Sequence, residues 1–209
     1  MAIVITVAQQ KGGTGKTTLA ANLAAALARD RRVALLDSDP QRSLTRWHET
    51  RSARSAPTVP LTFSDVSGWR LTAELDRLKR LHDVVLVDSP PQIDTDAKLA
   101  VRGASLVLVP VQPSAPDVWA AEGTLKLARE EKRPAAIVLN RVPPVSRLRD
   151  AIAADLTARK LPLLAASLGN RTGFASAFAE GLGVSEAAPR STAATELRAL
   201  LDELLGMTS

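Results

Sequence analysis

The stretch VAQQKGGTGKTTLAAN, residues 7–22, carries three glycines and two lysines between two apolar segments. The run IVITVA (3–8) before the glycines is typical of a buried strand, and KTTLAANLAAALARD (16–30) after them has the period of a helix. In such a strand–loop–helix unit, glycines let backbone N–H groups converge on oxygen atoms, and the helix adds its positive end. The stretch therefore predicts a phosphate-binding loop.

The loop also supplies side chains that a nucleoside triphosphate requires. Lys16 is placed to reach the β- and γ-phosphates, Thr17 to ligate Mg²⁺ through its hydroxyl, and Thr18 to contact the α-phosphate. Gln10 stands where the generic pattern G-x-x-x-x-G-K-[ST] has its first glycine. The predicted nucleotide-binding residues of the loop are Gly12, Gly13, Thr14, Gly15, Lys16, Thr17 and Thr18.

Apolar runs suited to buried parallel strands recur along the chain and alternate with segments of helical period. This alternation predicts an α/β fold of the P-loop NTPase type: a doubly wound, mostly parallel sheet with helices on both faces, in a single domain over residues 1–209. Residues 50–60 are polar and contain prolines, so we expect a loop there. The predicted strands are 3–8, 32–37, 83–88, 105–110 and 135–140, and the predicted helices are 16–30, 68–81, 117–131, 146–160 and 191–206.

Carboxylates follow two of the predicted strands. LLDSDPQ offers Asp37 and Asp39, and LVDSPP offers Asp88. The carboxyl ends of parallel strands converge beside the phosphate loop, which is where ligand-binding groups are expected in an open sheet. An acid after four apolar residues has the Walker B form, so Asp88 is expected to hold Mg²⁺ through a water molecule.

Composition excludes several classes of protein. The chain has no cysteine, which excludes disulfides, cysteine-ligated zinc and cysteine-held iron–sulfur clusters. Its start, MAIVITVAQ, lacks the basic leader of a signal peptide, and no apolar run reaches the ~20 residues of a membrane span. We therefore expect a cytoplasmic protein without a membrane partner. The net charge of +5 permits attraction to a polyanion, although it is equally compatible with an ordinary arginine-rich surface.

The motifs QQKGGTGKTT, LLDSDPQ and VVLVDSPP together resemble those of the deviant Walker A ATPases, the ParA/MinD superfamily. The resemblance implies an ATP-dependent sandwich homodimer that uses ATP and Mg²⁺ and hydrolyses ATP slowly, coupled to dimerisation. It gives Lys11 the role of the signature lysine, which reaches the phosphates of the partner subunit. It gives Asp39 the role of orienting the attacking water, and it places Asp37 near the Mg²⁺ water shell.

Within that superfamily the sequence is most similar to the ParA branch. DSDPQRSLTRW and VPVQPSAPDVWAAEG (109–123) resemble segments of that branch, and the chain resembles its short form, which lacks an N-terminal helix-turn-helix domain. The resemblance implies nonspecific binding of double-stranded DNA, association with the nucleoid, and a ParB-like or other cargo-adaptor protein that stimulates hydrolysis. The cargo stays open.

Adenine and DNA contacts are the remaining expectations. LNRV places Asn140 and Arg141 at the carboxyl edge of the sheet, where Asn140 is able to read the base or, alternatively, to cap a loop. The loop around GNRTGF (169–174) is a second expected contributor to the adenine site. The candidates for DNA contact are the basic residues Arg147, Arg149, Arg159, Lys160 and Arg171, each of which is alternatively a plain surface residue.

Two other functions stay open. One is a MinD-like ATPase that cycles on membranes, which requires a basic amphipathic terminal helix. The charges of residues 191–206 are net acidic, so we expect this helix to pack on the sheet instead. The other is a P-loop ligase of the dethiobiotin-synthetase type, which shares the fold but requires a small-molecule pocket.

Overall fold

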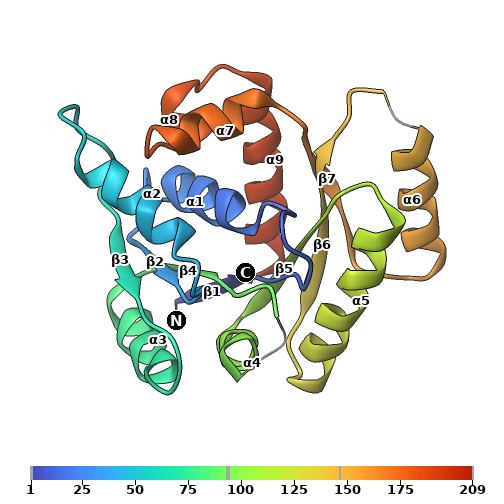
Figure 1. Ribbon diagram of the computed structural model, residues 1–209, viewed down its shortest axis with the longest axis horizontal. Coiled ribbons are helices and arrows are strands. Elements are labelled where there is room, and N and C mark those ends of the chain that lie inside the picture. The colour runs from blue at the N-terminus through green and yellow to red at the C-terminus, as the bar shows by residue number, and fades with distance from the viewer. Residues whose placement is uncertain (1, 93–94, 146, 209) are drawn as a thin grey trace.

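The computed structural model describes residues 2–92, 95–145 and 147–208. Within these residues the chain forms a seven-stranded parallel sheet in the order β3-β2-β4-β1-β5-β6-β7 (Figure 1). Strands β2, β4 and β5 are buried along their whole length, as predicted from their unbroken Val, Leu and Ile runs. The strands are β1 (Ile3–Val7), β2 (Val33–Asp37), β3 (Thr62–Asp65), β4 (Val84–Asp88), β5 (Leu106–Val111), β6 (Ala135–Val142) and β7 (Leu163–Gly169).

Helices cover both faces of the sheet, which confirms the predicted doubly wound fold (Figure 1). One layer contains α1 (Lys16–Leu27), α2 (Ser43–Ser52), α7 (Thr172–Ala179), α8 (Val184–Ala187) and α9 (Thr192–Met207). The other contains α3 (Arg70–Leu81), α4 (Thr95–Gly103), α5 (Ala115–Glu130) and α6 (Arg147–Ala158). Ser146, the first residue of one predicted helix, lies outside the described residues.

The register of the central strands places the functional segments at one edge. Asp88 pairs with Val7 on one side and with Asp37 on the other, so the carboxyl ends of β1, β2 and β4 are level. The glycine loop leaves β1 directly after this point. Two carboxylates that are 51 residues apart in sequence therefore lie beside the same loop, as the strand-end pattern predicted.

The structure corrects the prediction of a loop over residues 50–60, because the first three of these residues belong to α2. This helix is polar overall, yet Leu44 and Trp47 are buried in the core. Arg51 is also buried, where its guanidinium donates to both carboxylate oxygens of Glu186 and to the Val59 and Gly181 carbonyls. Arg51 is buried because distant segments supply its hydrogen-bond partners. The local sequence pattern therefore does not indicate that this charged position faces the core of the protein from a helix.

The terminal helix α9 packs on the sheet, as expected. Leu197, Leu200 and Leu204 are fully buried, and α9 lies against β7. Ser191 caps the helix by accepting a hydrogen bond from the Ala194 N–H. The apolar side of α9 is thus used in the core, which leaves no leucine stripe for a membrane surface. Among the described residues, no helix combines the length and the apolar character needed to span a bilayer.

Candidate nucleotide site

The phosphate loop connects β1 to α1 and turns through two glycines with positive φ. Gly13 has φ of +79° and Gly15 has φ of +92°, conformations that other residues rarely adopt. A Cβ on Gly15 would lie 2.7 Å from the Asn140 side-chain nitrogen, so that position also lacks space for a side chain. Asn140 donates to the Thr14 carbonyl at 2.8 Å and thereby holds the loop from β6.

Lys16 lies in a cradle of carboxylates at the start of α1. It is only 7% exposed, and burial lowers the pKa of its ammonium group. The charges of Asp88 and Asp39 oppose this shift and favour the charged form. The cradle thus holds a cation under the loop, where it is placed to meet phosphate oxygens.

Asp88 is a buried carboxylate with unused hydrogen-bonding capacity. Burial is the main cause that raises its pKa to about 8, and Asp37 adds to the rise. The Thr17 side chain and the Lys16 charge act in the opposite direction, yet neither Asp88 oxygen has a hydrogen-bond partner within the described parts of the chain. An unpaired buried carboxylate is costly, so this position suits an additional positive ligand.

The residues present fit Mg²⁺. Asp88 and the Thr17 hydroxyl are hard oxygen donors beside the loop, and Mg²⁺ commonly uses one or two protein oxygens together with phosphates and waters. No group of three acidic, histidine or cysteine side chains gathers as a metal cage among the residues that the structure describes. The donor set therefore matches an ion whose remaining ligands come from a nucleotide and from water.

Asp37 has a different environment from Asp88. One of its oxygens accepts from the Thr45 N–H at 2.9 Å and from the Thr45 hydroxyl at 2.8 Å, and the other accepts from the Asp39 N–H at 3.0 Å. Burial raises the pKa of Asp37, and these hydrogen bonds counteract the rise. Asp37 thus ties the end of β2 to α2 and fixes the backbone that carries Asp39.

A cavity of about 280 Å³ lies between the glycine loop and the segment after β2. The predicted residues Lys16, Thr17 and Asp39 all line it, so the structure brings these parts of the predicted site together. Asp39 is 9% exposed and faces this space, while one of its oxygens accepts from the Gln41 N–H. The further lining residues include Gly12, Gly13, Gly15, Thr18, Gln41, Ser43 and Arg141.

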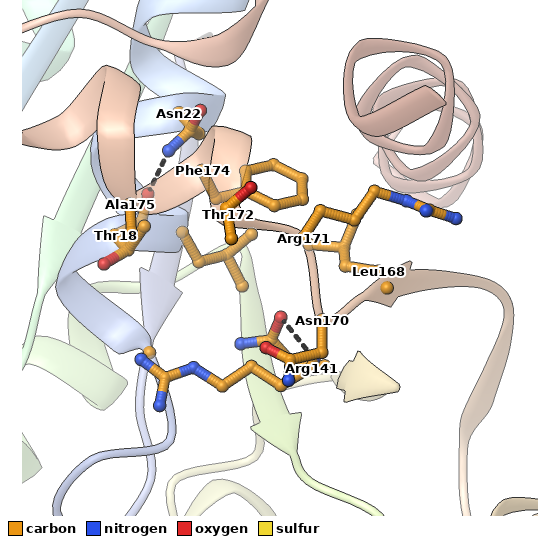
Figure 2. A pocket seen from close by; sticks show the side chains of 13 residues that line it. Thr18, Asn22, Arg141, Leu168, Asn170, Arg171, Thr172, Phe174 and Ala175 are labelled. Atoms are coloured by element: carbon orange, nitrogen blue, oxygen red, sulfur yellow. Dashed lines mark hydrogen bonds between the residues drawn. The ribbon is translucent and has the colours of Figure 1, made fainter. Parts of the chain in front are cut away.

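A second cavity of about 260 Å³ adjoins the first at Gly15, Thr18 and Arg141 (Figure 2). Its walls include the apolar side chains of Leu19, Leu168 and Phe174, which suit a planar base. Residues of the segment 169–174, predicted as a loop, line it together with Asn140, which accepts from the Arg141 N–H. The structure corrects the loop prediction, because Gly169 ends β7 and residues 172–174 begin α7. In Figure 2 the Arg141 side chain extends away from the apolar wall, toward the start of α1.

Lys11 lies outside both cavities. Its ammonium group forms an ion pair with the Asp117 carboxylate on α5, and 41% of the Lys11 side chain is exposed. Asp117 is nearly fully buried and also accepts a hydrogen bond from the Ser114 hydroxyl. Asp117 is not among the residues predicted from the sequence; the signal that could have found it is the Ser-x-x-Asp pattern at the start of α5.

The residues before Lys11 also rest on α5. Gln9 donates to the carbonyls of Pro110 and Asp117 at 3.4 Å. Gln10 packs so closely on Gly123 that a Cβ there would lie 1.9 Å from the Gln10 side chain. Gln10, where the generic pattern has glycine, therefore fills a space that Gly123 leaves open.

The five candidate DNA contacts differ in their environment. Arg159 forms ion pairs with Glu122 and Asp155. Arg171 binds Glu196 on α9, and Arg149 lies 3.0 Å from the Asp150 carboxylate. Arg147 and Lys160 are exposed. Three of the five charges are thus largely balanced by neighbouring acids.

Proteins of other organisms are similar to this chain in sequence and fold. Over 212 residues the chain is 33% identical to the maintenance of carboxysome distribution protein A of Halothiobacillus neapolitanus, covering 98% of this chain and 97% of that protein. It is 31% identical over 187 residues to the protein ParA of Rhizobium radiobacter, covering 85% and 83%. The solved Cyanothece McdA variant in complex with ATP matches with a TM-score of 0.81 at 21% identity, covering 98% of this chain and 96% of the other.

Residues 5–184 match the family described as the CobQ/CobB/MinD/ParA nucleotide binding domain. This match spans most of the chain, and the carboxysome-distribution relative extends the similarity to almost its full length. The glycine loop, the Asp88 strand end and the two adjoining cavities all lie inside the matched region. The chain therefore belongs to the CobQ/CobB/MinD/ParA family and is an ATPase of the ParA/MinD type.

Proposed function

We propose that the protein positions or segregates a cellular cargo through an ATP-driven cycle of dimerisation on DNA. The observation that carries this proposal is the different placement of the two lysines of the loop. Lys16 faces the acidic cradle, while Lys11 lies outside it on Asp117. A lysine that lies outside the nucleotide site of its own subunit is able to contact the nucleotide of a second subunit once its ion pair opens. Two subunits that close on two ATP molecules would use both lysines.

Each residue of the site then has a role. The cavity beside the loop would take the triphosphate, with Lys16 and the loop N–H groups on its oxygens. Thr17 and Asp88 would hold Mg²⁺, which neutralises phosphate charge, and Asp37 would keep the neighbouring backbone in place. Asp39 would orient the attacking water, and Lys11 of the partner subunit would stabilise charge on the transferring phosphoryl group.

The adjoining cavity supports a base site. Leu19, Leu168 and Phe174 would contact the faces and edges of adenine, and the segment 169–174 would close over it. Both polar ends of Asn140 already bond within the chain, so its main role would be to hold the loop. Arg141 lines both cavities and would contribute a positive charge near the phosphates.

Nonspecific binding of double-stranded DNA would keep the ATP dimer on the nucleoid in the cytoplasm. A ParB-like or other cargo-adaptor protein would stimulate hydrolysis, and ADP would release the dimer and the DNA. The names of the relatives, carboxysome distribution and ParA, support a cargo-positioning role and leave the cargo itself open.

The test is DNA binding in defined nucleotide states. Wild type and Asp39→Ala are incubated with Mg²⁺ and either ATP or ADP, then measured by light scattering and by a DNA electrophoretic shift. We expect Asp39→Ala with ATP to form a stable dimer that shifts DNA, and either protein with ADP to stay monomeric and unbound. Equal DNA binding in both states would contradict the DNA part of the proposal.

The alternatives predict different results in the same samples. A MinD-like protein would sediment with anionic vesicles in ATP, although the burial of the α9 leucines argues against an anchor there. A ligase of the dethiobiotin-synthetase type would stay monomeric in ATP, so a monomer in light scattering would favour it.

A further inference from the structure

Basic side chains gather at the end of the molecule remote from the phosphate loop. A hollow of about 500 Å³ lies where α1 leads into β2 and α3 leads into β4. Only Asp83 is acidic among the residues that line it, and it is bound by Arg32 at 2.7 Å. The lining residues are Ala2, Ile3, Arg31, Arg32, Lys79, Arg80, His82 and Asp83.

A second hollow of about 420 Å³ continues this positive surface. It is lined by Arg29 and Arg54, whereas its single acidic residue, Glu186, is held by the buried Arg51. Arg29 belongs to the same short turn as Arg31 and Arg32, so this turn connects the two hollows. The basic band is defined here as Arg29, Arg31, Arg32, Arg54, Lys79 and Arg80.

Several charges of the basic band form no close ion pair with any described residue, although the charge of Arg31 acts on Asp83. Arg29, Arg31 and Arg80 are exposed and form no ion pair within the described parts of the chain. The pairs that do involve the band are Arg32 with Asp83, Lys79 with Asp76 at 3.5 Å, and Arg54 with Glu180 at 3.8 Å. Asp30 is a further acid in the turn. The six cations of the band thus lie beside four acids, namely Asp30, Asp76, Asp83 and Glu180. Arg159 and Arg171, by contrast, are neutralised by close carboxylates.

Helix geometry separates the basic band from the nucleotide. α1 has 12 residues and thus spans roughly 18 Å from the phosphate loop to the turn that carries Arg29 and Arg31. Cations at the carboxyl ends of α1 and α3 also interact favourably with the helix dipoles. That interaction accounts for positive residues at helix ends, but it does not account for their arrangement around two connected hollows.

We propose that the basic band is the surface that contacts DNA, through the phosphates of the duplex and without reading bases. Arginine forks match phosphate geometry, and cations arranged around two hollows suit a protruding sugar–phosphate backbone better than a flat lipid surface. This inference rests on the DNA binding in the proposed function and adds its location.

The location also explains how ATP would control DNA binding. In a dimer closed around ATP the carboxyl edges of the two sheets face each other, so the two basic bands point outward. A monomer would contact DNA through one band, too weakly to shift it in electrophoresis. A dimer would contact DNA through two bands, and the second contact becomes effectively intramolecular on a DNA-dense surface. The ATP dimer should therefore bridge two DNA segments.

The test uses the Asp39→Ala protein with ATP as the parent. Arg29→Gln, Arg31→Gln and Arg80→Gln are combined in one variant, and Arg70→Gln, Lys98→Gln and Lys126→Gln in a matched control that loses the same charge from exposed sites elsewhere. Fluorescence anisotropy on a random-sequence duplex is measured over a salt series. We expect the band variant to bind at least tenfold more weakly, with a salt slope lower by about 2–3, and the control to bind within about twofold of the parent.

Bridging is measured by capture of a free fluorescent duplex on beads that carry a second duplex. We expect capture with ATP, none with ADP, and none with the band variant, whose ATP-dependent dimer is checked by light scattering. Band and control variants that bind equally would overturn the location while leaving the proposed function intact. DNA binding without capture would overturn the outward placement of the two basic bands in the ATP dimer. A parent that binds no DNA would overturn both proposals, as would band-dependent binding to anionic vesicles alone.

Discussion

Lys11 and Lys16 belong to one loop, five residues apart, yet their surroundings differ in almost every respect. Lys16 is 7% exposed in the acidic cradle, where burial lowers its pKa and Asp88 and Asp39 favour its charge. Lys11 is turned outward onto α5, where a single buried carboxylate, Asp117, holds it. Lys16 is thus fixed inside the site of its own subunit. Lys11 is held by one ion pair, which must open before Lys11 contacts another group.

The two halves of the loop are attached to different parts of the fold. Its second half is fixed by Asn140 from β6, while its first half rests on α5 through Gln9 and Gln10. A change at the start of α5 would therefore move Lys11 without disturbing the contacts of Lys16. This separation suits a site that first binds nucleotide and afterwards assembles.

Substitution of Lys16 should have the largest effect. Lys16→Ala removes a cation whose charge acts on Asp88 within the cradle, and in the proposed function it also removes a ligand of the phosphates. We expect ATP binding to weaken at least about 100-fold, since truncating one partner of a buried charge pair costs roughly 2–5 kcal/mol. Isothermal titration with ATP and Mg²⁺ measures this, with circular dichroism as the control for folding. Retained affinity would place the phosphates elsewhere.

Substitution of Lys11 should affect turnover and spare binding. Lys11→Ala should bind ATP within about twofold of wild type, because Lys11 lines neither cavity. Its turnover per subunit should not rise with protein concentration, whereas wild-type turnover should, by up to about 10³-fold for a charge supplied in trans. The matched control is Lys126→Ala on the exposed side of α5. A concentration dependence like that of wild type would remove the cross-subunit role.

Removal of the carboxylate that holds Lys11 should have a smaller effect in the opposite direction. Asp117→Asn keeps the shape and the contact with Ser114 but releases the ammonium group. We expect dimerisation with ATP at roughly three- to tenfold lower protein concentration, a coupling of about 1 kcal/mol, measured by light scattering. Ser114→Ala is the control. It removes the cap of α5, which costs about 1 kcal/mol of stability, and it leaves the Asp117 carboxylate in place. Identical behaviour of the two variants would show that the ion pair has no regulatory effect.

The features that could be predicted from the sequence are those with a local pattern. The glycine turn, the apolar strands and Asp88 at a strand end each follow from residues within one short segment, and the fold confirmed the strands and the convergence of their ends. The partner of Lys11 is 106 residues away, and nothing near Lys11 points to it. The hydrogen bonds of Asp37 depend on Thr45 in α2. The sequence pattern does not indicate this helix, because it is polar overall and contains the buried Arg51. Contacts of this kind depend on the packed structure.

The pH dependence of stability should have the smallest effect on the ATP cycle and should separate the cradle from the Lys11 contact. The folded protein raises the pKa of Asp88 from 3.8 to about 8, so between these values the folded state binds a proton that the unfolded state releases. This contribution to stability is complete below pH 4 and is lost as the pH rises toward 8. We therefore expect the thermal midpoint of wild type without nucleotide to fall, relative to that of Asp88→Asn, between pH 5 and pH 8. Each loss of about 1 kcal/mol lowers the thermal midpoint by roughly 2–4 °C in a chain of this size. Asp117→Asn should follow the wild-type profile, because Asp88 is unchanged in it. If Asp88→Asn kept the wild-type pH profile, the buried proton would belong to another group, and the case for a cation site at Asp88 would weaken with it.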